Sequence, residues 1–124
     1  MIKVKIDTKE KFHVITIEEP LLSANMTEEL SKKLLSHLKN EIKNVVLKLG
    51  VVSEIDQAVA NTILNIQETF YDNKVSFVIC ELQKPVESIF NQLEFSEVMN
   101  VTPTESEAWD IIQMEEIERE FTDV

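Results

Sequence analysis

Residues 45–56 read VVLKLGVVSEID, and this stretch sets the expected fold. Its first part, residues 45–49, is apolar at nearly every position, which is typical of a central strand with both faces covered. Asp56 closes the stretch and is a plausible cap for a helix. In that helix Val59, Ile63, Ile66 and Phe70 recur at helical spacing and predict a buried stripe. A buried strand followed by an amphipathic helix indicates an α/β protein.

The chain before this stretch predicts a hairpin and a helix. Residues 2–7 alternate, with Ile2, Val4 and Ile6 on one face and lysines on the other, which indicates a half-buried strand. Residues 12–17 form a second strand after a polar turn, so the pair is expected to be antiparallel. Asn25 is expected to cap a helix, with Glu28 reaching back to it. Leu30, Leu34, Leu35 and Leu38 form the apolar stripe of that helix.

The chain after this stretch continues the alternation of strands and helices. A buried strand over 75–80, a helix over 85–93 begun by Pro85, a short strand over 98–101 and a final helix are expected. Their apolar contacts are Ile89, Phe90 and Leu93 in the short helix, and Ala108, Ile111 and Ile112 in the last helix. Thr104 and Glu107 form a capping box for that last helix. The order predicts a single α/β domain over residues 1–124, with a mixed, mostly parallel five-stranded sheet, four helices and an N-terminal β-hairpin.

Composition restricts the class of partner. The chain has 124 residues and a net charge of −11, which argues against binding to nucleic acid or to an anionic membrane surface. An acidic chain is better suited to a basic protein partner, although the acidity is equally explained by solubility. Residues 105–124 are expected to form an acidic helix and tail. No apolar run has the length of a membrane span, and the N-terminus lacks the apolar core of a signal peptide, so we expect a cytoplasmic protein.

Groups that could support catalysis are few. Gly50 is the only glycine, which excludes phosphate-binding loops built on several glycines. Cys80 is the only cysteine and ends a predicted buried strand, so it is interpreted as a core residue. His13 and His37 lie on separate predicted elements with no further ligand at metal-binding spacing. We therefore expect no enzymatic activity, no cofactor and no metal.

The order of elements, together with two segments, resembles the STAS domain, named for sulfate transporters and anti-sigma factor antagonists. Residues 45–56 are similar to the family's strand and loop that lead into the next helix, and Ser53, Ile55 and Asp56 align with that segment. Residues 101–108, VTPTESEA, are similar to the start of the family's last helix. The resemblance covers about residues 2–116. It implies a protein-binding regulator of partner switching in bacterial signalling and in the regulation of transcription.

The resemblance also implies a partner and a switch. In anti-sigma factor antagonists, the loop after the third strand and the start of the next helix contact an anti-sigma factor that is also a serine kinase of the histidine-kinase-like ATPase type. This kinase phosphorylates a serine at the second position after the aspartate, and the added charge breaks the complex. The partner-binding residues carried over to this chain are Ser23, Ser53, Glu54, Asp56, Gln57, Ala58, Asn61 and Thr62.

The chain departs from the family pattern at the switch itself. The phospho-acceptor position is Ala58, which has no hydroxyl, and Val59 stands where a glycine is usual. Ser23 stands where an acidic residue is often found. Either the chain binds its partner constitutively, or it kept the fold while partner and mechanism diverged. Ser53, Thr62 and Ser23 are alternative phosphorylation candidates, and each also has an ordinary structural role available.

The predicted docking surface is acidic and partly apolar. No lysine or arginine occurs between Leu49 and Asn73, whereas Glu54 and Asp56 are present with Val51 and Val52. Such a surface fits a basic patch on a partner. The alternative function is a non-catalytic subunit or scaffold of a larger assembly, such as a transporter or a stress-signalling complex, and oligomers are possible.

Overall fold

One mixed sheet organises the computed structural model, which describes residues 2–93 and 100–122. Its strand order is β1-β2-β4-β6-β7. These strands are β1 (Val4–Thr8), β2 (Phe12–Ile17), β4 (Asn44–Lys48), β6 (Phe77–Cys80) and β7 (Val101–Thr102). β1 runs antiparallel to β2, and the other neighbours pair in parallel. The predicted hairpin and mostly parallel five-stranded sheet are therefore confirmed.

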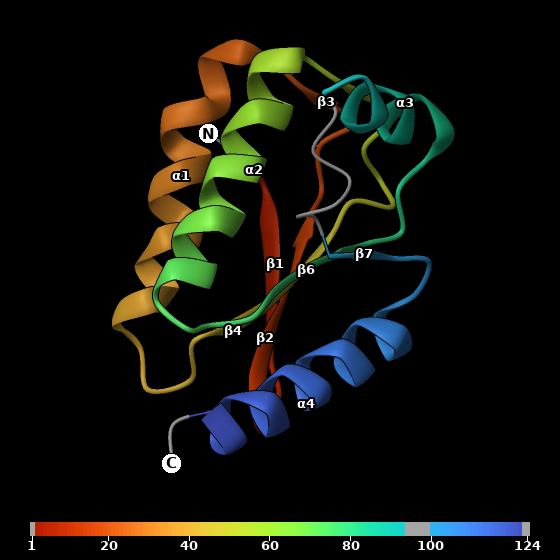
Figure 1. Ribbon diagram of the computed structural model, residues 1–124. Helices are drawn as coiled ribbons and strands as arrows, with labels where there is room; N and C mark the ends of the chain where they lie inside the picture. Colours follow the sequence, from red (N-terminus) through yellow and green to blue (C-terminus); the bar gives the residue numbers. More distant parts are fainter. Residues whose placement is uncertain (1, 94–99, 123–124) are drawn as a thin grey trace.

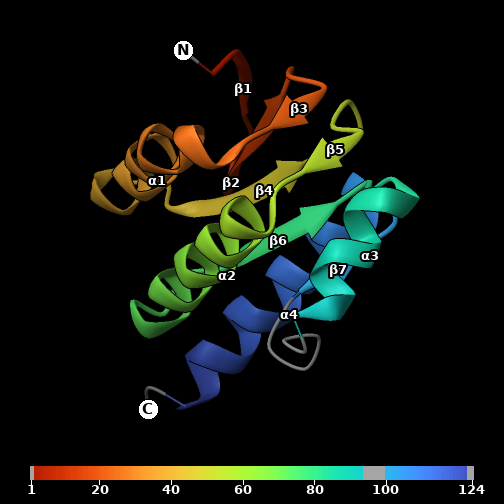
Figure 2. The ribbon, with the colours of Figure 1, turned by 90° about the horizontal axis from the view of Figure 1, so that it is seen from above.

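Helices cover both faces of this sheet. The helices are α1 (Thr27–Leu35), α2 (Gln57–Asp72), α3 (Lys84–Gln92) and α4 (Glu105–Thr122), with short 3-10 turns η1 (Ala24–Met26) and η2 (Ser36–Lys39). α1 and α2 pack side by side on one face, and α4 lies on the other (Figures 1 and 2). Within the part of the chain that the structure describes, no helix has both the length and the apolar character that a membrane span requires.

Strand β4 lies at the centre because both of its faces are apolar. Val45 and Leu47 belong to the larger core cluster under α1 and α2, whereas Val46 belongs to the smaller cluster under α4. All three side chains are fully buried. The predicted stripe of α2 and the inward positions Ala108 and Ile112 of α4 are buried as well. Alternation along one strand thus supplies both cores.

Three expectations about local structure were wrong. Ile6 is 51% exposed, and it lies on β1, the edge strand of the sheet. Asn25 does not cap α1: the helix begins at Thr27 after η1, and the Asn25 side chain accepts a bond from the Ser23 hydroxyl. The strand expected from residue 75 begins at Phe77.

The last predicted strand is only partly within the described residues. Residues 98 and 99 of the expected span 98–101 lie outside them. The structure has β7 at Val101–Thr102, paired with Ile79 and Cys80 of β6. The capping box of α4 is present in its first half, since the Glu107 amide donates to Thr104 Oγ1 at 3.2 Å.

The end of α2 has a lysine in a backbone conformation that favours glycine. The Lys74 amide donates to the Tyr71 carbonyl at 2.9 Å, and the Val75 amide donates to the Phe70 carbonyl at 2.9 Å. These two bonds form a Schellman motif, whose left-handed position is usually glycine. Lys74 occupies that position with φ of 60°. Lysine has a Cβ, so this residue carries the backbone strain that a glycine at the same position would avoid.

Replacing Lys74 with glycine is expected to raise the free energy of unfolding by about 1 kcal/mol, because the left-handed region costs an L-residue roughly 1–2 kcal/mol and glycine almost nothing. Urea unfolding of both proteins measures the change. Lys74→Ala is the matched control: it removes the same side chain but keeps a Cβ, so it gives no gain. Equal stability of the glycine and alanine variants would contradict this account.

Two histidines that lie far apart in the sequence meet beside the hairpin. The rings of His13 and His37 are 4.6 Å apart between centroids, and both residues are buried. His13 bonds through Nε2 to the Ile42 carbonyl at 2.9 Å and through Nδ1 to the Thr8 hydroxyl at 2.9 Å. Burial, and secondarily the nearby His13, lower the pKa of His37 below its ordinary value of 6.5.

This lowered pKa predicts that acid destabilises the fold through His37. As the pH falls below about 6.5, the unfolded chain takes up a proton at His37 more readily than the folded chain, so stability is lost as the pH continues down through the lower folded pKa. The loss of unfolding free energy from pH 7 to pH 5 should be smaller in His37→Gln, because titration of the carboxylates is common to both proteins. An equal loss in the two proteins would disprove the assignment.

Candidate partner-docking edge

A second, two-stranded sheet lies outside the main sheet and was not expected from the sequence. It pairs β3 (Leu21–Leu22) in parallel with β5 (Glu54–Ile55), and the two strands run side by side in Figure 2. The Pro20 carbonyl accepts the amides of Ser53 at 2.8 Å and Glu54 at 3.1 Å. The loop after β4 is thus joined to the connection that follows β2.

Asp56 fixes this junction from two sides. Its amide donates to the Leu22 carbonyl at 2.9 Å, and its carboxylate accepts the Ala24 amide at 2.8 Å. Asp56 occupies the predicted N-cap position of α2, but its side chain makes no cap hydrogen bond. The carboxylate instead holds the connection around Ser23 against the start of α2. Ser23 is therefore brought beside the loop after β4.

The loop after β4 also contacts the connection between β6 and α3. The Gly50 carbonyl accepts a bond from Gln83 Nε2 at 2.7 Å, and a Cβ at residue 50 would meet Glu81 Oε1 at 2.7 Å. Lys48 Nζ lies 3.4 Å from Glu81 and 3.3 Å from Glu105. Burial alone would lower the pKa of Lys48, but the pairs with Glu105 and Glu81 outweigh it and raise that pKa. Lys48 therefore stays charged and anchors the β6–α3 connection under the loop.

We name residues 21–24 and 51–62 the docking edge. Of the residues predicted to bind a partner, the exposed ones are Glu54, Asp56, Gln57, Ala58 and Asn61, and the half-buried ones are Ser23, Ser53 and Thr62. The structure brings all eight into this one edge. Ala58 is the second residue of α2 and is exposed.

Leu21 is a candidate contact residue that sequence reasoning missed. It is 44% exposed beside the loop that carries Val51, which is 47% exposed. The available signal was a pair of leucines directly after Pro20, between the predicted strand 12–17 and the following helix. Leu22, Val52 and Ile55 are buried beneath them. Exposed apolar side chains therefore stand on a fixed base, surrounded by carboxylates and amides, as in the mixed composition of protein interfaces.

The three alternative hydroxyls each make a bond within the chain. Ser53 Oγ donates to the Pro20 carbonyl at 3.1 Å, and Thr62 Oγ1 donates to the Ala58 carbonyl at 2.9 Å. Ser23 Oγ donates to the Asn25 side chain. Each hydroxyl thus has the structural role that its local sequence allows.

Within residues 2–93 and 100–122, no group of three or more His, Cys, Asp or Glu side chains is arranged to hold a metal ion. Cys80 is buried, and burial with nearby Glu81 raises the pKa of its thiol to about 12. A protonated thiol is a poor nucleophile at neutral pH.

The strand order, the hairpin at one edge and the helices on both faces of the sheet define a mixed α/β domain. Residues 3–108 match the family model described as the STAS domain. The chain therefore belongs to the STAS domain family. Comparison with curated proteins finds no matching sequence.

Solved structures share the fold at low sequence identity. A Thermotoga maritima protein proposed to be an anti-sigma factor antagonist has a TM-score of 0.76 at 17% identity, with 89% of this chain and 94% of that chain covered. The anti-sigma factor antagonist SpoIIAA of Bacillus in its unphosphorylated form has a TM-score of 0.71 at 14% identity, covering 90% and 96%. Solute carrier 26 family member A9, a murine anion transporter, gives 0.71 at 15% identity, covering 87% of this chain and 18% of the transporter.

Proposed function

We propose that this chain is a regulatory protein-binding domain that acts in the manner of an anti-sigma factor antagonist, through its docking edge. The observation that carries the proposal is the pair of hydrogen bonds that join Asp56 to Leu22 and Ala24. It holds Leu21, Val51 and Ala58 in place before a partner arrives, so little ordering entropy is lost on binding.

The partner we propose is a histidine-kinase-like ATPase domain that acts as serine kinase and anti-sigma factor, met in the cytoplasm. The docking edge supports this choice through its charge, because Glu54 and Asp56 are exposed and the sequence from Leu49 to Asn73 has no lysine or arginine. A basic surface on the partner would be attracted to it, with faster association at low salt.

The proposed complex is not switched by phosphorylation at residue 58. SpoIIAA has been solved in an unphosphorylated and in a phosphorylated form, whereas Ala58 has no oxygen to accept a phosphoryl group. The hydroxyls of Ser23, Ser53 and Thr62 each donate a hydrogen bond within the chain. We therefore propose that binding is constitutive and that release depends on the partner's own state.

Calorimetric titration of this chain with each histidine-kinase-like ATPase domain encoded in the same genome tests the proposal. We expect one of them to bind in a 1:1 complex that survives ATP and Mg²⁺. The matched control is Ala58→Ser, which restores the hydroxyl: it should bind equally, gain a phosphate detected by mass spectrometry, and then dissociate. If none of these domains binds the unmodified chain, the proposed partner is wrong.

A second candidate is a non-catalytic subunit or scaffold. It is favoured by the recurrence of this fold as a small part of the murine anion transporter. Co-purification of the chain with a permease and its ATPase, in place of a kinase, would support this second function over the first.

A further inference from the structure

Helix α4 has apolar side chains on two opposite faces. Toward the sheet it buries Ala108 and Ile112 against Val46 and Val78. The side chain of Arg119 also lies on this side, where Nη2 donates to Ser76 Oγ at 3.1 Å. This face is fully explained by packing on the sheet.

The opposite face of α4 has no such explanation. Met114, Ile117 and Phe121 are 59%, 53% and 78% exposed. Their spacing of three and four residues places them in one row along a helix. We name these three residues the α4 stripe. Large side chains that are scattered singly over a surface are ordinary, but a row of three on one helix marks a contact surface.

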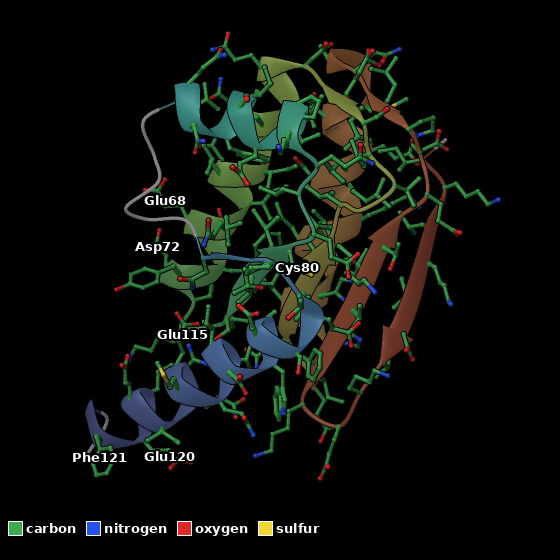
Figure 3. All side chains as sticks on the ribbon, turned by 90° about the vertical axis from the view of Figure 1, so that its right-hand side faces the viewer. Glu68, Asp72, Cys80, Glu115, Glu120 and Phe121 are labelled. Carbon is green, nitrogen blue, oxygen red and sulfur yellow. The ribbon has the colours of Figure 1, made fainter. Side chains whose placement is uncertain are left out.

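Carboxylates border the α4 stripe. Asp110, Glu118 and Glu120 lie within one turn of its members and on the same outward half of the helix. Arg119 is the only basic residue of α4, and it bonds on the sheet side. Figure 3 shows Glu115, Glu120 and Phe121 along α4. Carboxylates therefore border the stripe, and Glu120 among them also lines a pocket with Lys43 and Lys74.

This charge decides which occupant fits. In an α4-to-α4 contact between two copies, the bordering carboxylates would face one another, and each chain has a net charge of −11. An anionic membrane would be repelled in the same way. A groove on a partner with an apolar base could bury the three apolar side chains of the stripe. Lysine or arginine along its rim could pair with the bordering carboxylates. This is the pattern of an amphipathic helix bound in a groove, with anchors at i, i+3 and i+7.

We propose that the outward face of α4 is a second interaction surface, which binds an apolar groove lined by basic residues on a protein partner. It is carried by Met114, Ile117 and Phe121 and does not depend on the proposed function of the docking edge. The sheet separates the two surfaces, since α2 and α4 lie on its opposite faces (Figure 1). The chain would then hold two proteins at once.

A synthetic peptide tests the chemistry of this surface. The probe is a short peptide of leucine and lysine that forms an amphipathic helix with one apolar and one basic face, carrying a fluorescent label. We expect it to bind the full chain, and to bind a triple variant with Met114→Gln, Ile117→Gln and Phe121→Gln at least about tenfold more weakly. Raising the salt from about 0.1 M to about 1 M shortens the Debye length from about 10 Å to about 3 Å and should also weaken binding.

Matched variants separate this surface from the others. Ile6→Gln with Tyr71→Gln removes exposed apolar side chains elsewhere and should bind the peptide normally. Circular dichroism confirms that the triple variant is folded. Equal binding of the peptide to the triple variant and the unmodified chain would overturn the proposal. A dimer in sedimentation that the triple variant abolishes would overturn it too, because the occupant would be a second copy.

Discussion

Ala58→Asp is expected to weaken binding of the partner ATPase domain by at least about 100-fold, which corresponds to roughly 2.7 kcal/mol. Ala58 is exposed in the middle of the docking edge, at the second residue of α2. In the proposed contact Ala58 belongs with Leu21 and Val51 to the apolar part of the docking edge, so a carboxylate there would be buried away from the basic groups that face Glu54 and Asp56, which costs several kcal/mol. Stability should not fall, because a negative charge in the first turn of a helix interacts favourably with the helix dipole.

Calorimetry and urea unfolding together measure this effect. The matched control is Asn65→Asp, which adds the same charge to an exposed position of α2 two turns further along. We expect the control to change affinity no more than a few-fold. If Ala58→Asp binds as tightly as the unmodified chain, residue 58 is outside the contact and the docking edge is misplaced.

Phe70→Ala is expected to lower the free energy of unfolding by about 3–5 kcal/mol, which is a large part of the stability of a small domain. Phe70 is fully buried, and its ring lies 5.0 Å from that of Phe77 between centroids. Removing it opens a cavity between α2 and β6, which the surrounding strands cannot close completely. Loss of the aromatic pair adds to the cost.

The neighbouring residue supplies a control for this substitution. Tyr71 is 73% exposed, so Tyr71→Ala removes an aromatic ring from the same turn of α2 with a change of no more than about 0.5 kcal/mol. Urea unfolding of the three proteins gives both values. A loss of less than about 1 kcal/mol in Phe70→Ala would show that α2 is not packed on the sheet as described.

The sequence predicted those features that depend on short-range patterns of apolar residues. Val45, Val46 and Leu47 form an unbroken apolar run, and such a run is stable only when both faces of the strand are covered. Helix α2 was recognised for a similar reason, since its buried residues return at each turn. The mostly parallel sheet then followed from the alternation of strands and helices along the chain.

Features that depend on contacts between distant residues were not predicted. Strands β3 and β5 have two residues each, too few to form a pattern. The bond from Ala24 to Asp56 joins residues 32 positions apart, so Asp56 was recognised as a helix cap but not as a bridge. Ile6 has the same alternation as Val4, and its exposure depends on packing at the edge of the sheet, which alternation along the strand does not encode.

The two positions with positive φ angles could not be predicted from the sequence either. Lys74 and Glu81 have φ of 60° and 62°, and neither is glycine or asparagine, the residues by which such positions are usually recognised. At Lys74 the helix end requires this conformation, and at Glu81 the carboxylate is held by Lys48 beneath the docking edge.

The central claim is that a partner docks on residues 21–24 and 51–62. Hydrogen–deuterium exchange of the chain, alone and with its ATPase partner, tests this claim most directly. We predict slower exchange of backbone amides within these two segments on binding, and unchanged exchange in α1, α4 and β1. Slower exchange confined to those outer elements, with residues 51–62 unaffected, would contradict it.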